Sequence, residues 1–168
     1  ARAYRVSLSE AAQGDLDDYN SFNHFFSRAL KTDARPLDDD PQAILCPADG
    51  MISQSGTIEH GKMLQAKGHR YSLRNLIGED ADEFTGGSFA TVYLAPHNYH
   101  RVHLPAKATL VHTTAIPGEL FSVNAYTEAA VDNLFARNER LVCRFQTEHG
   151  TMLVVLVGAL IVASIETV

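Results

Sequence analysis

The 168-residue sequence predicts an α+β protein, with short N-terminal helices followed by a core of mostly antiparallel strands. Apolar side chains recur at helical spacing within residues 21–30. From residue 43 onward, short apolar runs rich in β-branched residues alternate with turn signals made of Gly, Pro and Asp. The composition, 45% hydrophobic and 20% charged, is typical of a globular protein with a real core.

Residues 1–40 are predicted to form a helical lead-in to this core. Ser21 is the expected N-cap of a short helix over 21–30. Its apolar face comprises Phe22, Phe25, Phe26, Ala29 and Leu30. Core packing is the favoured interpretation of this face, and a membrane-proximal helix flanked by Arg28, Lys31 and Arg35 is the alternative. Neighbouring acidic residues dilute that basic patch, so membrane binding by this segment alone would be weak.

Residues 41–168 are predicted to form the β-rich core. The expected strands are 43–46, 51–59, 62–66, 89–94, 108–116, 140–145 and 152–157, the last two forming a hairpin. One short helix is expected over 72–78, closed by Gly78. Residues 120–138 give no clear pattern.

The longest apolar run, 153–163, falls short of the roughly 20 residues of a membrane-spanning helix. It predicts two buried strands that meet at Gly158. Because such a strand lies so close to Val168, the chain is expected to be cut off rather than finished, and no secretory signal opens it.

Charge and cysteine content narrow the function classes. A net charge of −6 and a pI near 5.7 argue against a general nucleic-acid binder, which needs a basic face. The two cysteines, Cys46 and Cys143, are expected to be buried thiols in a reducing compartment, because a domain of this size needs no disulfide.

The histidines of segment 95–105 are the strongest signal of chemistry. His97, His100 and His103 stand at three-residue intervals. Three interpretations apply: a metal site, which requires a helical turn; acid–base catalysis with Asp49 as orienting carboxylate; or structural histidines. The flanking prolines favour a loop that enters a strand, and an extended strand would point the three rings in different directions. A metal site is therefore less favoured than acid–base catalysis.

Two further segments carry reactive groups. Asp49 precedes Gly50 in a pattern typical of a turn, so its carboxylate has either a turn role or a catalytic one. Residues 65–71 hold the cationic group Lys67, His69 and Arg70, which is either a solvated loop or an anion-binding one.

Taken together, eight motifs in this order resemble the bacterial phosphatidylserine decarboxylase family. They lie at residues 22–26, 35–36, 47–50, 65–73, 99–105, 117–124, 134–140 and 157–168. The resemblance covers about residues 20–168, and eight motifs in the family's order are highly specific.

The resemblance implies that the protein makes its own cofactor. In this family a serine of a Leu-Gly-Ser-Thr motif attacks the preceding peptide bond, which releases a large β chain and a small α chain that begins with a pyruvoyl group. The pyruvoyl carbonyl forms a Schiff base with the amine of phosphatidylserine and withdraws electrons as CO2 leaves, giving phosphatidylethanolamine. This chain is then the β-chain portion, inactive without the α chain, which completes a sandwich-like or barrel-like core. The expected location is the cytoplasmic side of the membrane, held peripherally, with a homodimer left open.

Residue roles follow by motif. His103 resembles the base that activates the processing serine, Asp49 the carboxylate that orients it, and His100 the residue that serves decarboxylation. Lys67 and His69 belong to a loop near the substrate in the family, and a head-group role for Lys67 is our own inference. His97 is expected to be a variable loop residue, and no metal ligand is assigned.

This sequence departs from the family in lacking Leu-Gly-Ser-Thr, so the pyruvoyl serine is expected beyond Val168. The alternatives are a pyruvoyl-type decarboxylase of another amino acid or head group, and a metal-binding module built on the three histidines.

Overall fold

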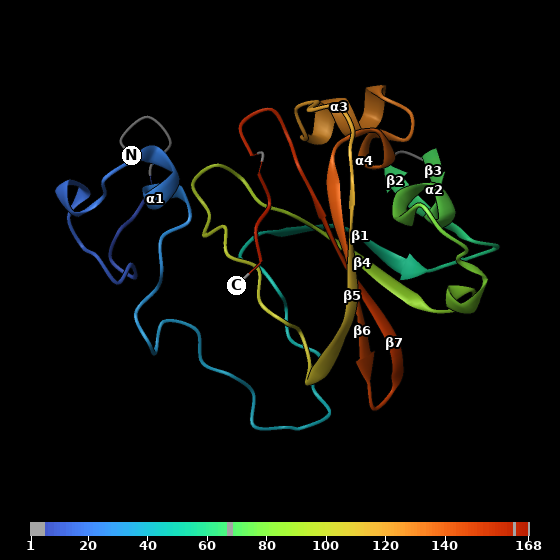
Figure 1. Cartoon of the computed structure of the whole chain (residues 1–168), viewed down its shortest axis with the longest axis horizontal. Helices are drawn as coiled ribbons and strands as arrows, with labels where there is room; N and C mark the ends of the chain where they lie inside the picture. The colour runs from blue at the N-terminus through green and yellow to red at the C-terminus, as the bar shows by residue number, and fades with distance from the viewer. Residues whose placement is uncertain (1–5, 67–68, 163, 168) are drawn as a thin grey trace. The chain divides into compact units, whose positions relative to one another are not determined.

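The computed structural model describes residues 6–66, 69–162 and 164–167. The chain divides into two compact units, one made of residues 1–51 with 92–107 and the other of 52–91 with 108–168. Helices and antiparallel strand pairs are both present, so the predicted α+β class is confirmed (Figure 1). The predicted division into a lead-in over 1–40 and a core over 41–168 stays a prediction.

The first unit carries the predicted N-terminal helix in a shortened form. Helix α1 covers Phe22–Phe26, and the Ser21 hydroxyl accepts the His24 N–H at 3.1 Å, which confirms the N-cap. A 3-10 helix, Leu16–Asp18, precedes it. The helix does not continue to Leu30, because that residue pairs its backbone with Ala11 instead. Tertiary pairing has overridden the helical pattern.

The apolar stripe of the α1 region is only partly buried, and a membrane-proximal role for it stays a prediction. Phe22 is exposed, whereas Phe25 and Phe26 are half-buried. Arg28, expected to flank the helix on a basic surface, is only 4% exposed. No helix among residues 6–66, 69–162 and 164–167 is long and apolar enough to cross a membrane.

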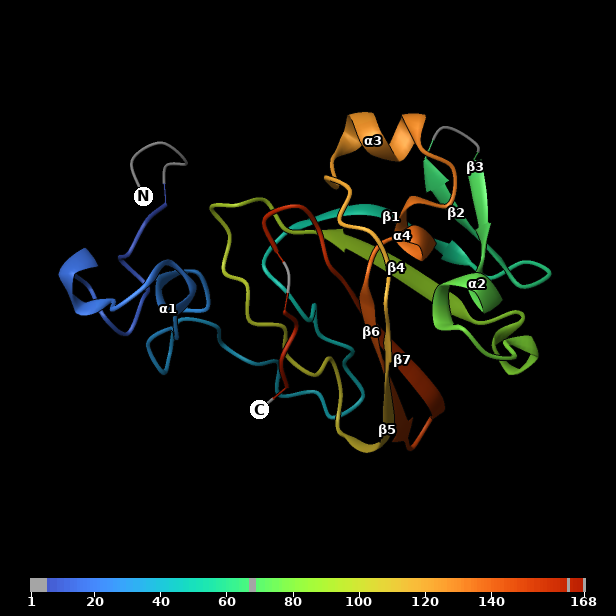
Figure 2. The same ribbon diagram turned by 45° about the horizontal axis from the view of Figure 1, so that its top comes forward.

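Antiparallel strands dominate the second unit. Strands β5 (Ala108–Ile116), β6 (Arg140–Thr147) and β7 (Gly150–Val157) form a three-stranded sheet with β6 in the middle (Figure 2). Strands β2 (Lys62–Ala66) and β3 (His69–Ser72) form a hairpin that the sequence predicted only in its first half. A further two-stranded sheet joins β1 (Met51–Thr57) to β4 (Ser88–Tyr93), and the division between units falls inside both of these strands.

Two corrections concern the strands. The apolar run at 43–46 forms no strand, and the strand expected after Gly158 is a tight turn in which Ala159 pairs with Val162. None of the sheets in the described residues closes into a barrel. Sandwich-like packing and completion by a partner chain remain predictions.

Short helices join the strands of the second unit. Helix α2 (Leu73–Ile77) ends as predicted at Gly78, which adopts a left-handed φ of 76°. The unassigned segment 120–138 contains α3 (Ala125–Ala130) and α4 (Leu134–Arg137). Another 3-10 helix covers Asp82–Phe84.

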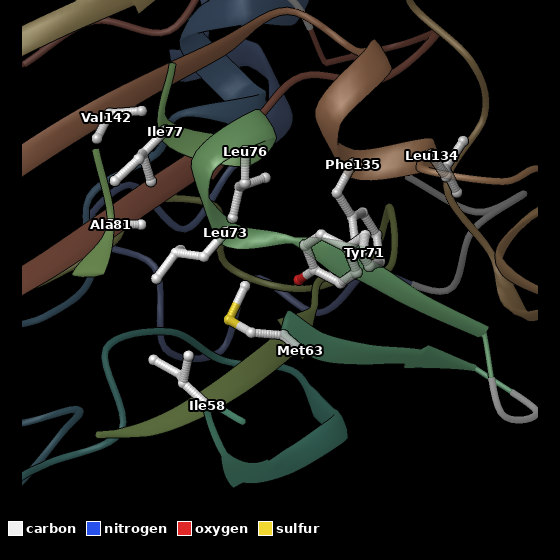
Figure 3. Packing of buried hydrophobic residues seen from close by; sticks show 10 residues of the cluster. All are labelled: Ile58, Met63, Tyr71, Leu73, Leu76, Ile77, Ala81, Leu134, Phe135 and Val142. Atoms are coloured by element: carbon white, nitrogen blue, oxygen red, sulfur yellow. The ribbon is translucent and has the colours of Figure 1, made fainter. Parts of the chain in front are cut away.

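The hydrophobic core of the second unit gathers side chains from the β2–β3 hairpin, helices α2 and α4, the middle strand β6 and two loop positions (Figure 3). Its buried members are Ile58, Met63, Tyr71, Leu73, Leu76, Ile77, Ala81, Leu134, Phe135 and Val142. Burial of this apolar surface supplies the main favourable term in folding.

Buried polar side chains connect the loops around that core. The Asn138 amide, fully buried, donates to the carbonyls of Phe121 (2.9 Å) and Gly158 (2.8 Å) and accepts the Phe121 N–H at 3.0 Å. The Arg140 guanidinium donates to the Leu76 carbonyl at 2.6 Å, near the C-terminal end of α2. Three of the sequence motifs thus meet at one asparagine.

Candidate active site

Backbone hydrogen bonds hold the segment before Asp49 beside the histidine stretch, within the first unit. The Leu45 N–H donates to the Pro105 carbonyl at 2.8 Å, and the His103 N–H donates to the Pro47 carbonyl at 2.7 Å. This pairing replaces the strand predicted at 43–46 and brings the Asp49 and His103 segments together, as the predicted pair requires.

Gly50 allows the chain to turn close to the end of β4. A Cβ on Gly50 would lie 2.4 Å from the Tyr93 carbonyl oxygen, which is closer than real Cβ atoms approach. The glycine beside Asp49 is therefore required by close backbone approach.

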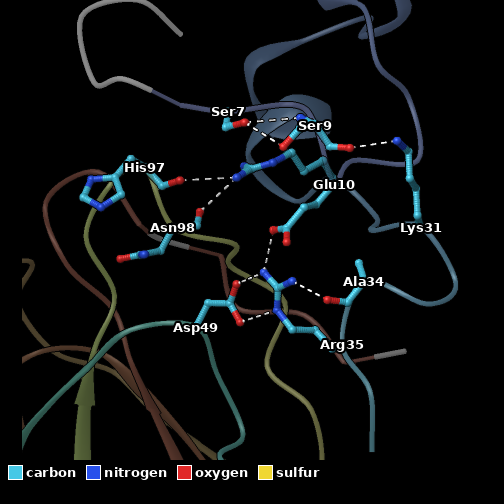
Figure 4. Close-up of polar contacts among 10 residues, drawn as sticks. Ser7, Ser9, Glu10, Lys31, Ala34, Arg35, Asp49, His97 and Asn98 are labelled. Atoms are coloured by element: carbon cyan, nitrogen blue, oxygen red, sulfur yellow. Dashed lines mark hydrogen bonds and ion pairs between the residues drawn. The ribbon is translucent and has the colours of Figure 1, made fainter.

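Asp49 is held by an arginine that the sequence analysis had not assigned to it. Arg35 Nε donates to Oδ1 at 2.9 Å and Arg35 Nη2 donates to Oδ2, a two-point ion pair (Figure 4). The hydrogen bonds from Arg35 lower the pKa of Asp49 below its usual range, with smaller contributions from the charges of Arg35, His103 and Arg28. The carboxylate is therefore ionised at neutral pH, and each of its oxygens can still accept a further hydrogen bond.

His103 lies exposed, with its ring against Tyr99. The Nε2 atom is 2.9 Å from the Tyr99 hydroxyl, and the two rings stack at 5.6 Å. Within the described part of the chain, Asp49 and His103 interact through their charges and share no hydrogen bond. Asp49 is engaged by Arg35 and His103 by Tyr99.

His100 occupies a different environment from His103. Its ring packs on Phe26 with centroids 4.0 Å apart, and its Nδ1 lies 2.9 Å from the Asn98 carbonyl oxygen. Burial, as the largest cause, lowers the pKa of His100, so the ring is neutral near pH 7. Since a carbonyl only accepts, Nδ1 carries the proton and Nε2 has a free lone pair.

His97 is exposed. Its backbone carbonyl accepts a hydrogen bond from Arg28 Nη2 at 3.3 Å, and its charge is a minor cause that lowers the pKa of His100. Throughout the residues that the structure describes, no three His, Cys, Asp or Glu side chains gather as a metal-binding group.

A cavity of about 190 Å³ opens beside Asp49 in the first unit. It is lined by Ser7, Glu10, Ala11, Arg28, Leu30, Arg35, Asp49, His97, Asn98 and Tyr99. Charged groups of both signs thus face a space large enough for a small polar group.

The structure does not describe the side chains of the two remaining predicted residues. Lys67 lies outside the described residues, and His69 begins β3 with a side chain that is not described. The nearby Gln65, fully buried, donates from Nε2 to the carbonyls of Glu128 (2.8 Å) and Val131 (2.9 Å).

Cys143 is buried as predicted, but Cys46 is exposed, because its segment lies outside any sheet. Both thiols are free.

Sequence reasoning missed Arg35, Tyr99, Phe26 and Arg28 as members of the site. All except Arg28 lie inside quoted motifs, so the motifs marked their positions. Their contacts could not be read from spacing, because Arg35 is 14 residues from Asp49 and Arg28 is 70 residues from Asn98.

Comparisons with known proteins agree with the motif pattern. The profile of the family described as phosphatidylserine decarboxylase matches residues 22–168. The chain is 61% identical to a phosphatidylserine decarboxylase proenzyme of Ectopseudomonas mendocina (strain ymp), over all of this chain and 60% of that protein. It is 59% identical to the proenzyme of Bordetella pertussis (strain Tohama I / ATCC BAA-589 / NCTC 13251), over 99% of this chain and 57% of that protein. The chain thus spans about 60% of the length of these relatives, and it belongs to the phosphatidylserine decarboxylase family.

Proposed function

We propose that this chain is the β-chain portion of a pyruvoyl-dependent enzyme that converts phosphatidylserine to phosphatidylethanolamine and CO2. The observation that carries the proposal is the difference between the environments of two histidines that lie three residues apart, His100 and His103. One ring, His103, lies beside an ionised carboxylate, and the other, His100, is desolvated and neutral. These environments suit two different proton-transfer tasks.

The first task is self-cleavage. His103 takes the proton of the processing serine, and Asp49 stabilises the charge that the imidazole then acquires. In this structure the Tyr99 hydroxyl lies within hydrogen-bond distance of His103 Nε2. The hydroxyl of the processing serine would take the place of Tyr99 as the partner of Nε2. The serine itself belongs to the part of the proenzyme that lies outside this chain.

The second task belongs to decarboxylation. A pyruvoyl group, once joined to the substrate amine, supplies the electron sink for the bond that CO2 leaves. His100 fits a site of this kind, since Nε2 has a free lone pair in a desolvated ring. In this proposal Nε2 takes the proton that the substrate's ammonium group must lose before its nitrogen can react with a carbonyl, and returns it to the carbon from which CO2 has departed.

The partner chain covers strand β5 in this proposal. Seven consecutive residues of β5, 109–115, are exposed, including Leu110 (49%) and Val111 (56%). Among the described strands β5 pairs with β6 alone, which leaves its other edge open. A strand from the remaining 40% or so of the proenzyme would complete the sheet and produce the sandwich-like core.

The substrate and its surroundings complete the proposal. Lys67 and His69 are assigned to substrate binding, Lys67 at the head group of phosphatidylserine, and the enzyme is held peripherally at the cytoplasmic side of the membrane. A homodimer is compatible with this arrangement, and nucleic acid has no part in it.

The test uses the full-length proenzyme. His103→Ala and Asp49→Ala should leave it uncleaved on a denaturing gel, whereas His100→Ala should cleave normally and release no CO2 from phosphatidylserine vesicles. His97→Ala is the matched control and should do both. Normal cleavage of the His103→Ala protein would remove His103 from the mechanism, and CO2 release from soluble amino acids rather than the lipid would indicate a different substrate.

A further inference from the structure

Two residues at the end of α1 and just after it act on His100, one through ring packing and one through a shared carbonyl. Phe26 packs on the imidazole, and Arg28 lies two residues later, 4% exposed. Arg28 Nη2 donates to the Asn98 carbonyl oxygen at 3.3 Å, the same oxygen that His100 Nδ1 approaches at 2.9 Å. One carbonyl therefore connects the guanidinium with the imidazole.

Arg28 is not stabilised in the way that a buried cation usually is. In the part of the chain that the structure describes, it forms no ion pair: it donates to the carbonyls of His97 and Asn98 and lies 5.5 Å from the centre of the Phe25 ring. Its Nη1 is buried and has no hydrogen-bond partner among the described residues. A buried charge with an unused donor costs folding free energy, which suggests a role beyond filling space.

We propose that Arg28 is a positioning residue for His100, fixing the Asn98 carbonyl that keeps the imidazole proton on Nδ1 and holding the ring neutral through its charge. Because the proton is kept on Nδ1, Nε2 stays available for proton exchange. This consequence rests on the proposed function, whereas the effect on His100 itself does not.

Most of the groups around His100 lower its pKa, and one raises it. Burial is the largest cause that lowers its pKa, and the charges of Arg28 and His97 lower it further. The Asn98 carbonyl acts in the opposite direction by accepting the Nδ1 proton. Phe26 contributes an uncharged ring. Removing Arg28 therefore removes a repulsive charge and leaves the Asn98 carbonyl to His100 alone, and both changes raise the pKa of His100.

The direct test is a histidine titration of the processed full-length protein, labelled with ¹³C at histidine Cε1 and followed by NMR. The His100 resonance is identified by its loss in His100→Gln. We expect Arg28→Met to move the His100 midpoint upward by about one pH unit, and Arg28→Lys to move it less because the charge is kept. If Arg28→Met does not fold, Arg28→Gln must give the same upward movement.

Arg101→Met is the matched control. Its Nε donates to the Ser27 carbonyl at 2.7 Å, so it anchors the same loop to the end of α1 without contacting the Asn98 carbonyl. The His100 midpoint should not move in this variant. An unmoved midpoint in folded Arg28→Met, or an equal movement in Arg101→Met, would overturn the assignment and reduce Arg28 to a structural residue.

A second measurement separates this inference from the proposed function. CO2 release from phosphatidylserine vesicles is followed against pH for wild type and Arg28→Met, with self-cleavage checked on a gel. If His100 Nε2 acts as a base, the acidic limb of the rate profile should move to higher pH by the same amount as the NMR midpoint. A wild-type protein without CO2 release would refute the proposed function while the titration still decides the role of Arg28.

Discussion

Arg35 contacts Asp49 through Nε and Nη2, and the same Nη2 atom donates to Glu10 at 2.9 Å. One guanidinium therefore binds two carboxylates and fixes the plane of Asp49. Bidentate pairs of this kind are more directional than single ion pairs. The orientation of the carboxylate beside His103 is thus set by a residue from the N-terminal lead-in.

Replacing Arg35 by Met should raise the pKa of Asp49 and reduce stability in a pH-dependent way. Because the pKa of Asp49 is lowered in the folded protein, its contribution to stability is present above the unfolded pKa of about 3.9 and is lost as the pH falls through the folded value. At pH 7 we expect a loss of about 1 kcal/mol, since the pair is partly exposed. Urea unfolding at pH 7 and near pH 2.5 measures this loss of unfolding free energy. The control is Arg74→Met, which removes an exposed ion pair with Asp80. An equal loss at both pH values would contradict the argument.

Replacing Gly50 by Ala should destabilise the protein by about 1–3 kcal/mol, the usual cost of overpacking. The new methyl group would meet the Tyr93 carbonyl oxygen at 2.4 Å, and backbone cannot move aside as a flexible side chain can. Thermal unfolding checks this, and Gly14→Ala, which would meet nothing within 4 Å, serves as control. Equal melting temperatures for the two variants would show that the turn can relax.

Replacing Gln65 by Met should cost about 2–5 kcal/mol, because it leaves several buried backbone groups without partners. The Gln65 amide donates to two carbonyls and accepts the Leu134 N–H at 3.1 Å. Denaturant unfolding should detect the loss. The exposed Gln146, which bonds only the carbonyl of Thr147, provides the control Gln146→Met, expected to change stability by less than about 0.5 kcal/mol.

Replacing Glu128 by Gln should increase stability at neutral pH and leave it unchanged in acid. Burial raises the pKa of Glu128, so the folded state holds its proton more tightly than the unfolded state does. The resulting penalty is absent below the unfolded pKa of about 4.3 and grows as the pH rises through the folded value. Unfolding at pH 4 and pH 7 tests the sign. A gain in stability of the same size at both pH values would mean that ionisation of Glu128 is not the cause. The control is Glu119→Gln, which changes a carboxylate in an exposed ion pair.

Much of the fold could be predicted because strong local patterns coincide with tertiary structure. Strand β5 spans the predicted 108–116, where β-branched residues run into the turn at Pro117 and Gly118. The prediction of a strand at 43–46 was wrong because it rested on apolar residues alone. In the structure Ile44 is 74% exposed, and Leu45 bonds the Pro105 carbonyl outside any strand. Helices α3 and α4 were missed because they are too short to show helical periodicity and are marked mainly by their asparagine N-caps.

For the site, the motifs supplied Asp49, His100 and His103, but the contacts between side chains could not follow from the sequence. Nothing local indicates that Arg35 would bind Asp49, or that Arg28 would be buried beneath the histidine stretch rather than exposed beside α1. Such contacts depend on how distant segments pair, and pairing is decided by tertiary structure. The sequence therefore identified the reactive groups and not the residues that control them.

The open edge of β5 has a consequence for how such a protein can be made. A long, exposed edge strand with apolar residues invites pairing with other molecules and hence aggregation. When two segments belong to one polypeptide, each meets the other at an effective concentration of about millimolar, far above that of separate copies in a cell. If the proposed proenzyme supplies the strand that covers β5, synthesis as a single chain would protect this edge from aggregation before cleavage takes place.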